Sequence, residues 1–177
     1  MSIFSSSKRK KTKKRQVLCR EVEIFTQVHF VRERNSEKYK YNTLSLKFDP
    51  DRIKCEEWYE NHGNPDTYSQ IITAYMSDSN LDANAICDKF HLGKNYFETL
   101  RSNPQYNPSK GEAVILSFVL QLSYEECRAL LKSAGYALTN SDKSDLIIRY
   151  FLENHDYSIS DLNYCLDYFE QPNIKNI

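Results

Sequence analysis

Apolar residues at helical spacing in positions 83–102 constrain this chain more tightly than any other stretch. Residues three or four apart lie on one face of a helix, so the spacing predicts two short helices that pack on each other across a tight turn. Cys87 is small enough to let the two helices cross closely. His91 falls where the turn needs a left-handed backbone, which histidine adopts more readily than most residues. The predicted inner-face residues are Ile86, Cys87, Phe90, Leu92, Phe97 and Leu100.

The predicted outer face of the second helix is polar. In a helix-turn-helix protein this helix enters the major groove and presents such side chains to base edges. Two amphipathic helices with a short link also occur in helical domains of other function, so a protein–protein adaptor is the alternative. The residues that we expect to bind nucleic acid here are Lys94, Asn95, Glu98, Thr99, Arg101, Ser102 and Lys110.

The sequence after this motif adds a resemblance to a known family. Residues 101–136, RSNPQYNPSKGEAVILSFVLQLSYEECRALLKSAGY, resemble the later part of phage-repressor-like (Cro/C1, XRE-type) DNA-binding domains. In those domains a loop after the recognition helix leads into a fourth and a fifth helix. The resemblance covers roughly residues 67–137. It implies a mainly α fold, with a lambda-repressor-like helix-turn-helix bundle.

A second resemblance concerns residues 144–166, SDLIIRYFLENHDYSISDLNYCL. This stretch is similar to a helical extension that follows such domains in bacterial proteins of mobile and defence loci. Some of those proteins carry a macro domain or sit beside a retron reverse transcriptase. The two resemblances together imply a nucleic-acid-binding regulator, or an accessory or effector subunit of an anti-phage or mobile-element system such as a retron. The alternative is an adaptor subunit of a defence complex that has the same fold but reads no DNA.

Charge divides the chain into two parts, although its net charge is zero. Residues 1–54 hold 15 Lys and Arg against 6 Asp and Glu, which gives +9, and the other residues hold 9 against 18, which gives −9. The basic part suits contact with phosphate, whereas the acidic part repels nucleic acid except where its few cations cluster. We expect residues 1–16 to form a disordered arm that binds phosphate, with a solvated tail as the alternative. Its cations are Lys8, Arg9, Lys10, Lys11, Lys13, Lys14 and Arg15.

Residues 17–63 are expected to form a β-hairpin followed by a helix. Apolar residues alternate with polar ones over 18–32 and again over 39–48, which is typical of strands. Phe25 and Val31 interrupt the first alternation, so a helix is the alternative there. Asp49-Pro50 marks a helix start that would lead to residue 61. Aromatic residues among the lysines of 38–48 could stack on single-stranded bases or pack on the core.

The remaining residues predict helices only. We place the helix-turn-helix domain at 64–138 and a C-terminal helical extension at 139–177. Two capping boxes, Ser109 with Glu112 and Ser123 with Glu126, mark helix starts. Gly135 suits a helix end. The expected core residues are Ile71, Ile72, Tyr75, Met76, Ala113, Leu116, Val119, Leu120, Cys127, Leu130, Leu131, Leu146, Ile147, Tyr150, Leu162, Leu166 and Phe169.

The composition argues against several classes of protein. There is no glycine-rich phosphate loop, and the four His residues and five Cys residues form no motif of known chemistry. We therefore expect no enzyme, no metal site and no cofactor. With no apolar run of membrane length and no signal sequence, we expect a cytoplasmic protein without membrane contact. The expected partners are duplex DNA or structured single-stranded DNA or RNA, with a protein partner in a defence complex and a homodimer as further options.

Overall fold

Eight α-helices and one short 3-10 helix make up the described part of the chain, residues 3–30 and 66–177 of a computed structural model. No strand occurs in these residues, so the expectation of a mainly α fold is confirmed. The elements are α1 (Ile3–His29), α3 (Tyr68–Asp78), α4 (Ala83–Phe90), α5 (Tyr96–Ser102), α6 (Lys110–Val119), α7 (Tyr124–Ser133), α8 (Lys143–Glu153), α9 (Ile159–Tyr168) and η1 (Ile174–Asn176).

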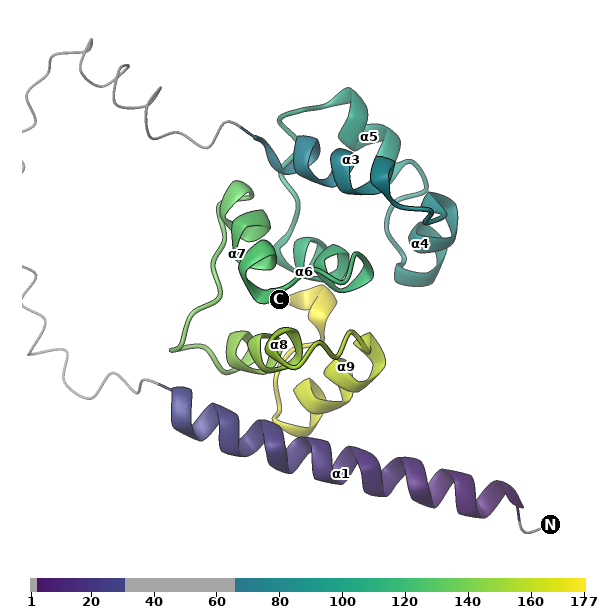
Figure 1. Cartoon of the computed structure of the whole chain (residues 1–177), viewed down its shortest axis with the longest axis vertical. Coiled ribbons are helices and arrows are strands. Elements are labelled where there is room, and N and C mark those ends of the chain that lie inside the picture. The colour runs from purple at the N-terminus through teal and green to yellow at the C-terminus, as the bar shows by residue number, and fades with distance from the viewer. Residues whose placement is uncertain (1–2, 31–65) are drawn as a thin grey trace, which may run out of the picture.

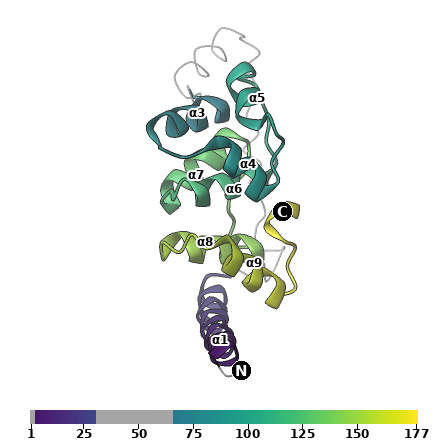
Figure 2. The same ribbon diagram turned by 90° about the vertical axis from the view of Figure 1, so that its right-hand side faces the viewer.

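The helices are stacked in layers along the long axis of the molecule. Figures 1 and 2 show α3, α4 and α5 at one end, α6 and α7 beneath them, α8 and α9 next, and α1 across the other end. Helix α3 contacts α5 and α7, α6 contacts α7 and η1, and α1 contacts both α8 and α9. Helix α1 therefore packs against the two α-helices that come last in the sequence.

Local sequence signals explain where most of these helices begin. Both expected capping boxes are confirmed, since Ser109 and Ser123 accept from the backbone N–H three residues later and the glutamate there accepts in return. Thr67 and Gln70 form a third capping box at the start of α3. A capping box satisfies two helix-end N–H groups that would otherwise lack partners. Helices α4, α8 and α9 begin instead at Asp82, Asp142 and Ser158, which cap with one side chain.

Helix α6 lies at the centre of the core. The expected inward residues Ala113 and Leu116 are completely buried, and so are their neighbours Val114 and Ser117. The Ser117 hydroxyl donates to the Ala113 carbonyl at 2.9 Å, so this buried polar group has a partner within its own helix. Expected core residues elsewhere are also buried, namely Ile72, Met76, Cys127, Leu130, Leu131, Leu146, Ile147, Leu162 and Leu166.

The predicted strand over 18–32 is wrong in its described part, 18–30, where the alternative, a helix, is found. Residues 3–29 form one continuous helix, and the residues expected to be a disordered arm supply its first turns. Cys19, Val22 and Thr26 are buried at a spacing of three and four residues, which follows a helical period and not a period of two. Apolar and polar residues alternate here as in a strand because apolar residues occupy two opposite faces of α1. The second predicted strand and the helix over 50–61 lie outside the described residues.

Close backbone packing at Gly111 fixes the C-terminal segment. A β-carbon at this position would lie 2.3 Å from the carbonyl oxygen of Ile174, in η1. Ile174 is itself completely buried. Only glycine therefore lets η1 approach the first turn of α6 this closely.

We expect Gly111→Ala to lower the free energy of unfolding by about 1–3 kcal/mol, because the added methyl group overpacks a backbone contact. Alanine in place of an ordinary helical glycine has the opposite effect, a gain of about 1 kcal/mol. Urea unfolding measures the difference. Gly93→Ala is the control, since nothing lies within 4 Å of a β-carbon there. A more stable Gly111→Ala protein would contradict the packing of η1.

Candidate nucleic-acid interface

Helices α4 and α5 are joined by the tight turn that the sequence predicts. Asp82 caps α4 by accepting from the N–H groups of Asn84 and Ala85. His91 ends the helix with a left-handed backbone, φ 53° and ψ 40°, and the next residue, Leu92, donates from its N–H to the Cys87 carbonyl at 3.0 Å. The expectation for His91 is therefore confirmed.

The inner faces of the two helices are buried together. Ile86, Cys87, Phe97 and Leu100 are buried as expected, whereas Phe90 and Leu92 are half-buried. Tyr96, which we did not predict as an inner-face residue, is also buried. It lies four residues before Leu100, so the helical period could have identified it.

Tyr96 connects α5 to α3 through a pair of phenols. Its hydroxyl lies 3.0 Å from the Tyr68 hydroxyl, and both rings are buried. Burial raises the pKa of Tyr96 well above its ordinary value, and the nearby Tyr68 and Glu112 add to the effect. The pair stays protonated at neutral pH and holds α5 at a fixed rotation, which determines the side chains it presents outward.

The outer face of α5 is exposed along its length. Thr99 donates from its hydroxyl to the Asn95 carbonyl and Ser102 to the Glu98 carbonyl, both at 2.9 Å, so each hydroxyl oxygen can still accept a hydrogen bond. Asn95 stands at the start of α5, and its side chain caps no backbone group. The exposed residues are Lys94, Asn95, Glu98, Thr99, Arg101 and Ser102.

Charges on this unit balance one another. Three cations, Lys89, Lys94 and Arg101, stand against three acids, Asp82, Asp88 and Glu98, within residues 82–102. Within the described part of the chain, Lys94 and Arg101 form no ion pair and are free to contact a ligand. Hydrogen bonding, more than long-range attraction, is therefore what this face can offer a nucleic acid.

Lys110, which we expected at the interface, forms an ion pair within the protein. Its ammonium lies 2.5 Å from the carboxylate of Asp145, which is almost completely buried, and so links α6 to α8. The other carboxylate oxygen of Asp145 accepts from the N–H of Thr139 at 2.9 Å. Lys110 balances a buried charge, because a carboxylate is strongly destabilising inside a protein unless it is paired.

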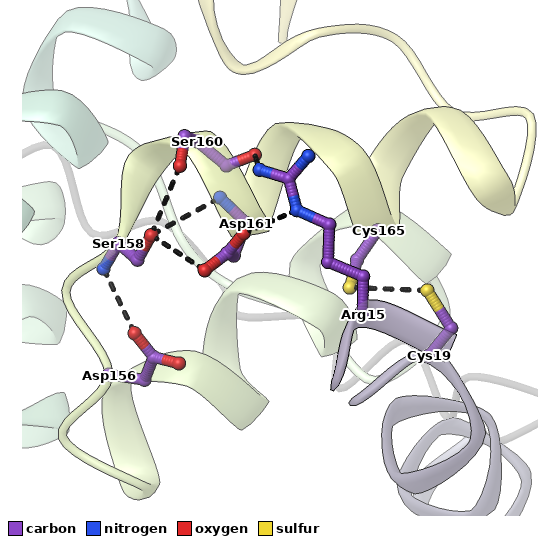
Figure 3. A network of polar contacts seen from close by, with 7 residues as sticks. All are labelled: Arg15, Cys19, Asp156, Ser158, Ser160, Asp161 and Cys165. Carbon is purple, nitrogen blue, oxygen red and sulfur yellow. Dashed lines mark hydrogen bonds and ion pairs between the residues drawn. The ribbon is translucent and has the colours of Figure 1, made fainter. Parts of the chain in front are cut away.

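Arg15 is likewise held by the protein itself. Figure 3 shows its guanidinium directed at Asp161 on α9, where Nε donates to the carboxylate at 2.7 Å. The same group stacks on the Tyr164 ring at 4.8 Å. Burial would raise the pKa of Asp161, but hydrogen bonds from Arg15 and Ser158 outweigh it and lower the pKa overall. Arg15, which we expected to bind phosphate, therefore attaches α1 to the body through these contacts.

The other residues of α1 that we expected to bind phosphate form a separate group. Lys11, Lys13 and Lys14 are exposed, and the backbones of Lys8, Arg9 and Lys10 lie in the same helix. Figures 1 and 2 place α1 and α5 at opposite ends of the molecule. The structure therefore divides the expected site residues into two surfaces that do not meet.

An open groove of about 1090 Å³ adjoins α4. Its walls include Lys89 and His91 from α4 and its turn, Tyr157 and Asn163 from α9 and the segment before it, and Lys175 from η1. Every buried side-chain nitrogen and oxygen in the described residues has a hydrogen-bond partner. In the same residues, no three His, Cys, Asp or Glu side chains are arranged to hold a metal ion.

Comparison with known proteins adds no relative, because no family model, curated protein or solved structure matches this chain. Among the described helices, none is both long enough and apolar enough to cross a membrane.

We expect Arg15→Ala to lower the free energy of unfolding by about 1–2 kcal/mol, since it removes a charged hydrogen bond from the partly buried Asp161. Because the pKa of Asp161 is lowered in the folded protein, this stabilisation is present above the ordinary aspartate pKa and disappears as the pH falls through the folded value. Denaturant unfolding at pH 7 and in acid tests both statements. The control is Lys13→Ala, an exposed change expected to stay within about 0.5 kcal/mol. Equal stabilities for the two variants at pH 7 would contradict the anchoring role.

His91→Gly should raise the free energy of unfolding by about 0.5–1 kcal/mol, because glycine adopts a left-handed backbone without steric strain. His91→Val should lower it, since a β-branched residue fits this conformation worst. Thermal unfolding of the two variants gives the comparison. A stabilising valine would show that the turn has a different backbone in solution.

Proposed function

We propose that this protein binds nucleic acid, with the outer face of α5 contacting the bases of duplex DNA as the second helix of a repressor-like helix-turn-helix does. In this proposal it acts as a regulator, or as an accessory or effector subunit, of a bacterial anti-phage or mobile-element system such as a retron. The observation that carries the proposal is the two-sided character of α5. One face is buried against α3 and α4, and the other presents an unbroken set of exposed polar side chains.

The side chains on that face match the hydrogen-bonding groups of base pairs. Asn95 can donate to and accept from adenine, and Lys94 can donate to the acceptors of guanine in the major groove. Thr99 can place its methyl group against that of thymine while its back-bonded hydroxyl accepts a hydrogen bond. Glu98 can accept from the amino group of cytosine, the one base that offers a donor and no acceptor there. The face therefore favours selectivity over raw affinity.

Residues 82–102, which hold α4 and α5, can make few phosphate contacts, and this sets the expected salt dependence of binding. Lys89, Lys94 and Arg101 are their only cations, so binding through α5 alone should depend on salt with a slope of about −2 to −3. The exposed lysines of α1 lie at the other end of the molecule and would have to contact a separate stretch of backbone. A steeper slope would indicate that α1 takes part as well.

An adaptor is the second candidate, and one observation favours it. Residues 55–177, which include α3 to η1, hold twice as many acids as cations. Such a body attracts a basic protein surface at long range and repels nucleic acid. In this case the exposed face of α5 would contact protein, and its polar residues would set the specificity of that contact.

Selection of bound sequences from a random duplex pool tests the leading proposal. We expect the wild type to enrich one motif, Asn95→Ala to relax the preference at one base pair, and Lys94→Ala to relax it at a neighbouring one, each at a cost of about 1–3 kcal/mol. Lys132→Ala is the matched control, because it removes the same charge from an exposed position on α7.

Thermal unfolding should be nearly the same for all four proteins, since the substituted side chains are exposed. A wild-type pool without an enriched motif, at low salt and in repeated rounds, would exclude base readout by α5. Pull-down of a basic protein by the same surface, abolished in Lys94→Ala and Asn95→Ala, would then support the adaptor.

A further inference from the structure

Two buried cysteines face each other where α1 packs on α9. The sulfur of Cys19 lies 3.6 Å from that of Cys165, and both side chains are almost completely removed from solvent. Figure 3 shows the two thiols meeting between the helices. The other cysteines of the described residues, Cys87 and Cys127, are buried apart from any described cysteine. Within this part of the chain, only Cys19 and Cys165 are therefore placed to react with each other.

The distance between the two sulfurs is close to that of a covalent bond. The sulfurs of a disulfide lie about 2 Å apart, so a gap of about 1.5 Å remains to be closed. Small rotations of the two side chains cover such a gap. A disulfide here would therefore join α1 to α9 close to the arrangement that the two helices already have.

An oxidant can reach the two thiols when α1 leaves the body. Helix α1 is the outermost layer at its end of the molecule (Figures 1 and 2) and packs on α8 and α9. Within residues 11–30, only Cys19, Val22 and Thr26 are buried. An element with so few buried residues opens at a lower cost in free energy than the whole protein. Brief release of α1 exposes both thiols, and redocking returns them to contact.

Charged neighbours give the two thiols different reactivity. Arg15 lies one helical turn before Cys19 on α1, and Asp161 lies one turn before Cys165 on α9. Burial raises the pKa of both thiols, but Arg15 opposes the rise at Cys19, whereas the neighbouring Cys19 and the carboxylates of Asp161 and Asp156 add to it at Cys165. Arg15 and Asp161 stay beside their cysteines when α1 is released. Because the thiolate is the reactive form, Cys19 is the thiol that meets the oxidant first.

We propose that Cys19 and Cys165 form a redox modification site, at which a hydroperoxide converts the two thiols into a disulfide that locks α1 onto α9. The Cys19 thiolate attacks one oxygen of hydrogen peroxide, so that an S–O bond forms, the O–O bond breaks and the first water leaves. The Cys165 sulfur then attacks the sulfur of the Cys19 sulfenic acid. The S–S bond forms, the S–O bond breaks and the second water leaves.

The atoms and electrons of this reaction balance. The two thiols lose two electrons, hydrogen peroxide gains them, and the two thiol protons end in the two waters. A thiol reductant reverses the modification by exchange. In a reducing compartment such a bond is transient and reports oxidative conditions. The modification does not depend on the proposed role of α5, because α1 and α5 lie at opposite ends of the molecule.

Peptide mapping of the full chain after treatment with hydrogen peroxide tests the site. Free thiols are alkylated, the protein is digested without reductant, and disulfide-linked peptides are identified by mass spectrometry. We expect the Cys19–Cys165 pair as the main product. These are the first and last of the five cysteines, and an unfolded chain favours pairs that close shorter loops. Cys127→Ala is the matched control, because it removes an equally buried thiol and should leave the product unchanged.

Thermal unfolding and sulfenic acid labelling test the lock and the order of reaction. The oxidised wild type should melt about 5 °C or more above the same protein reduced with dithiothreitol, since the cross-link closes a long loop. Cys165→Ala should show no such difference. In that variant dimedone should label Cys19, and in Cys19→Ala it should label Cys165 at least about fivefold less. Circular dichroism checks that both variants are folded.

Alkylation of the reduced protein by iodoacetamide tests the release of α1. Arg15→Ala removes the contact with Asp161, so Cys165 should be modified at least about threefold faster than in the wild type. Lys13→Ala, an exposed change on the same helix, should leave the rate unchanged. A different main disulfide, a Cys19–Cys165 product that forms only in urea, an oxidised protein that melts no higher than the reduced one, or a Cys165 rate that Arg15→Ala leaves unchanged would each overturn the proposal.

Discussion

The burial of α6 is the constraint on which the rest of this structure depends. Its residues 113–118 are almost entirely removed from solvent, so other elements have to cover all of its sides. Helix α7 covers one side, and η1 covers another through the close approach at Gly111. Helix α8 is joined to its start by the ion pair of Lys110 with the buried Asp145. A buried carboxylate such as that of Asp145 is tolerated only when its cation is present. Removing one partner of a buried ion pair lowers the free energy of unfolding by about 3–5 kcal/mol. This makes α8 an obligatory neighbour of α6.

The two ends of the molecule, on either side of α6, expose surfaces of different chemical character. At one end α3 fixes the rotation of α5 through the buried pair of Tyr68 and Tyr96, so that a polar face is turned outward. At the other end α8 and α9 bury one face of α1 and leave the opposite face, with its apolar residues, in solvent. One end of the molecule is therefore suited to hydrogen bonding and the other to apolar contact and positive charge.

The sequence predicts helix starts and core residues correctly where a local pattern determines them. The helix period placed Ile86, Phe97 and Leu100 in the core, and the capping boxes marked the starts of α6 and α7, because these signals depend on residues three or four apart. It failed for α1, where buried and exposed apolar residues on opposite faces imitate the alternation of a strand. It also did not reveal the partners of two cations. Arg15 and Lys110 resemble surface residues in sequence, and their partners, Asp161 and Asp145, lie 146 and 35 positions away.

The contacts of α1 also determine the order in which the chain can be completed on the ribosome. Arg15 and Cys19 pair with Asp161 and Cys165, each 146 residues later. At about 5–20 residues per second, some 7–30 s pass between the synthesis of the two sides. A helix without tertiary contacts is marginally stable in water, so during this interval α1 has both of its apolar faces unburied on the nascent chain. Among the described helices, α1 precedes α8 and α9 in the sequence and completes its contacts only once both exist, and for that time it is open to chaperones and to other nascent chains.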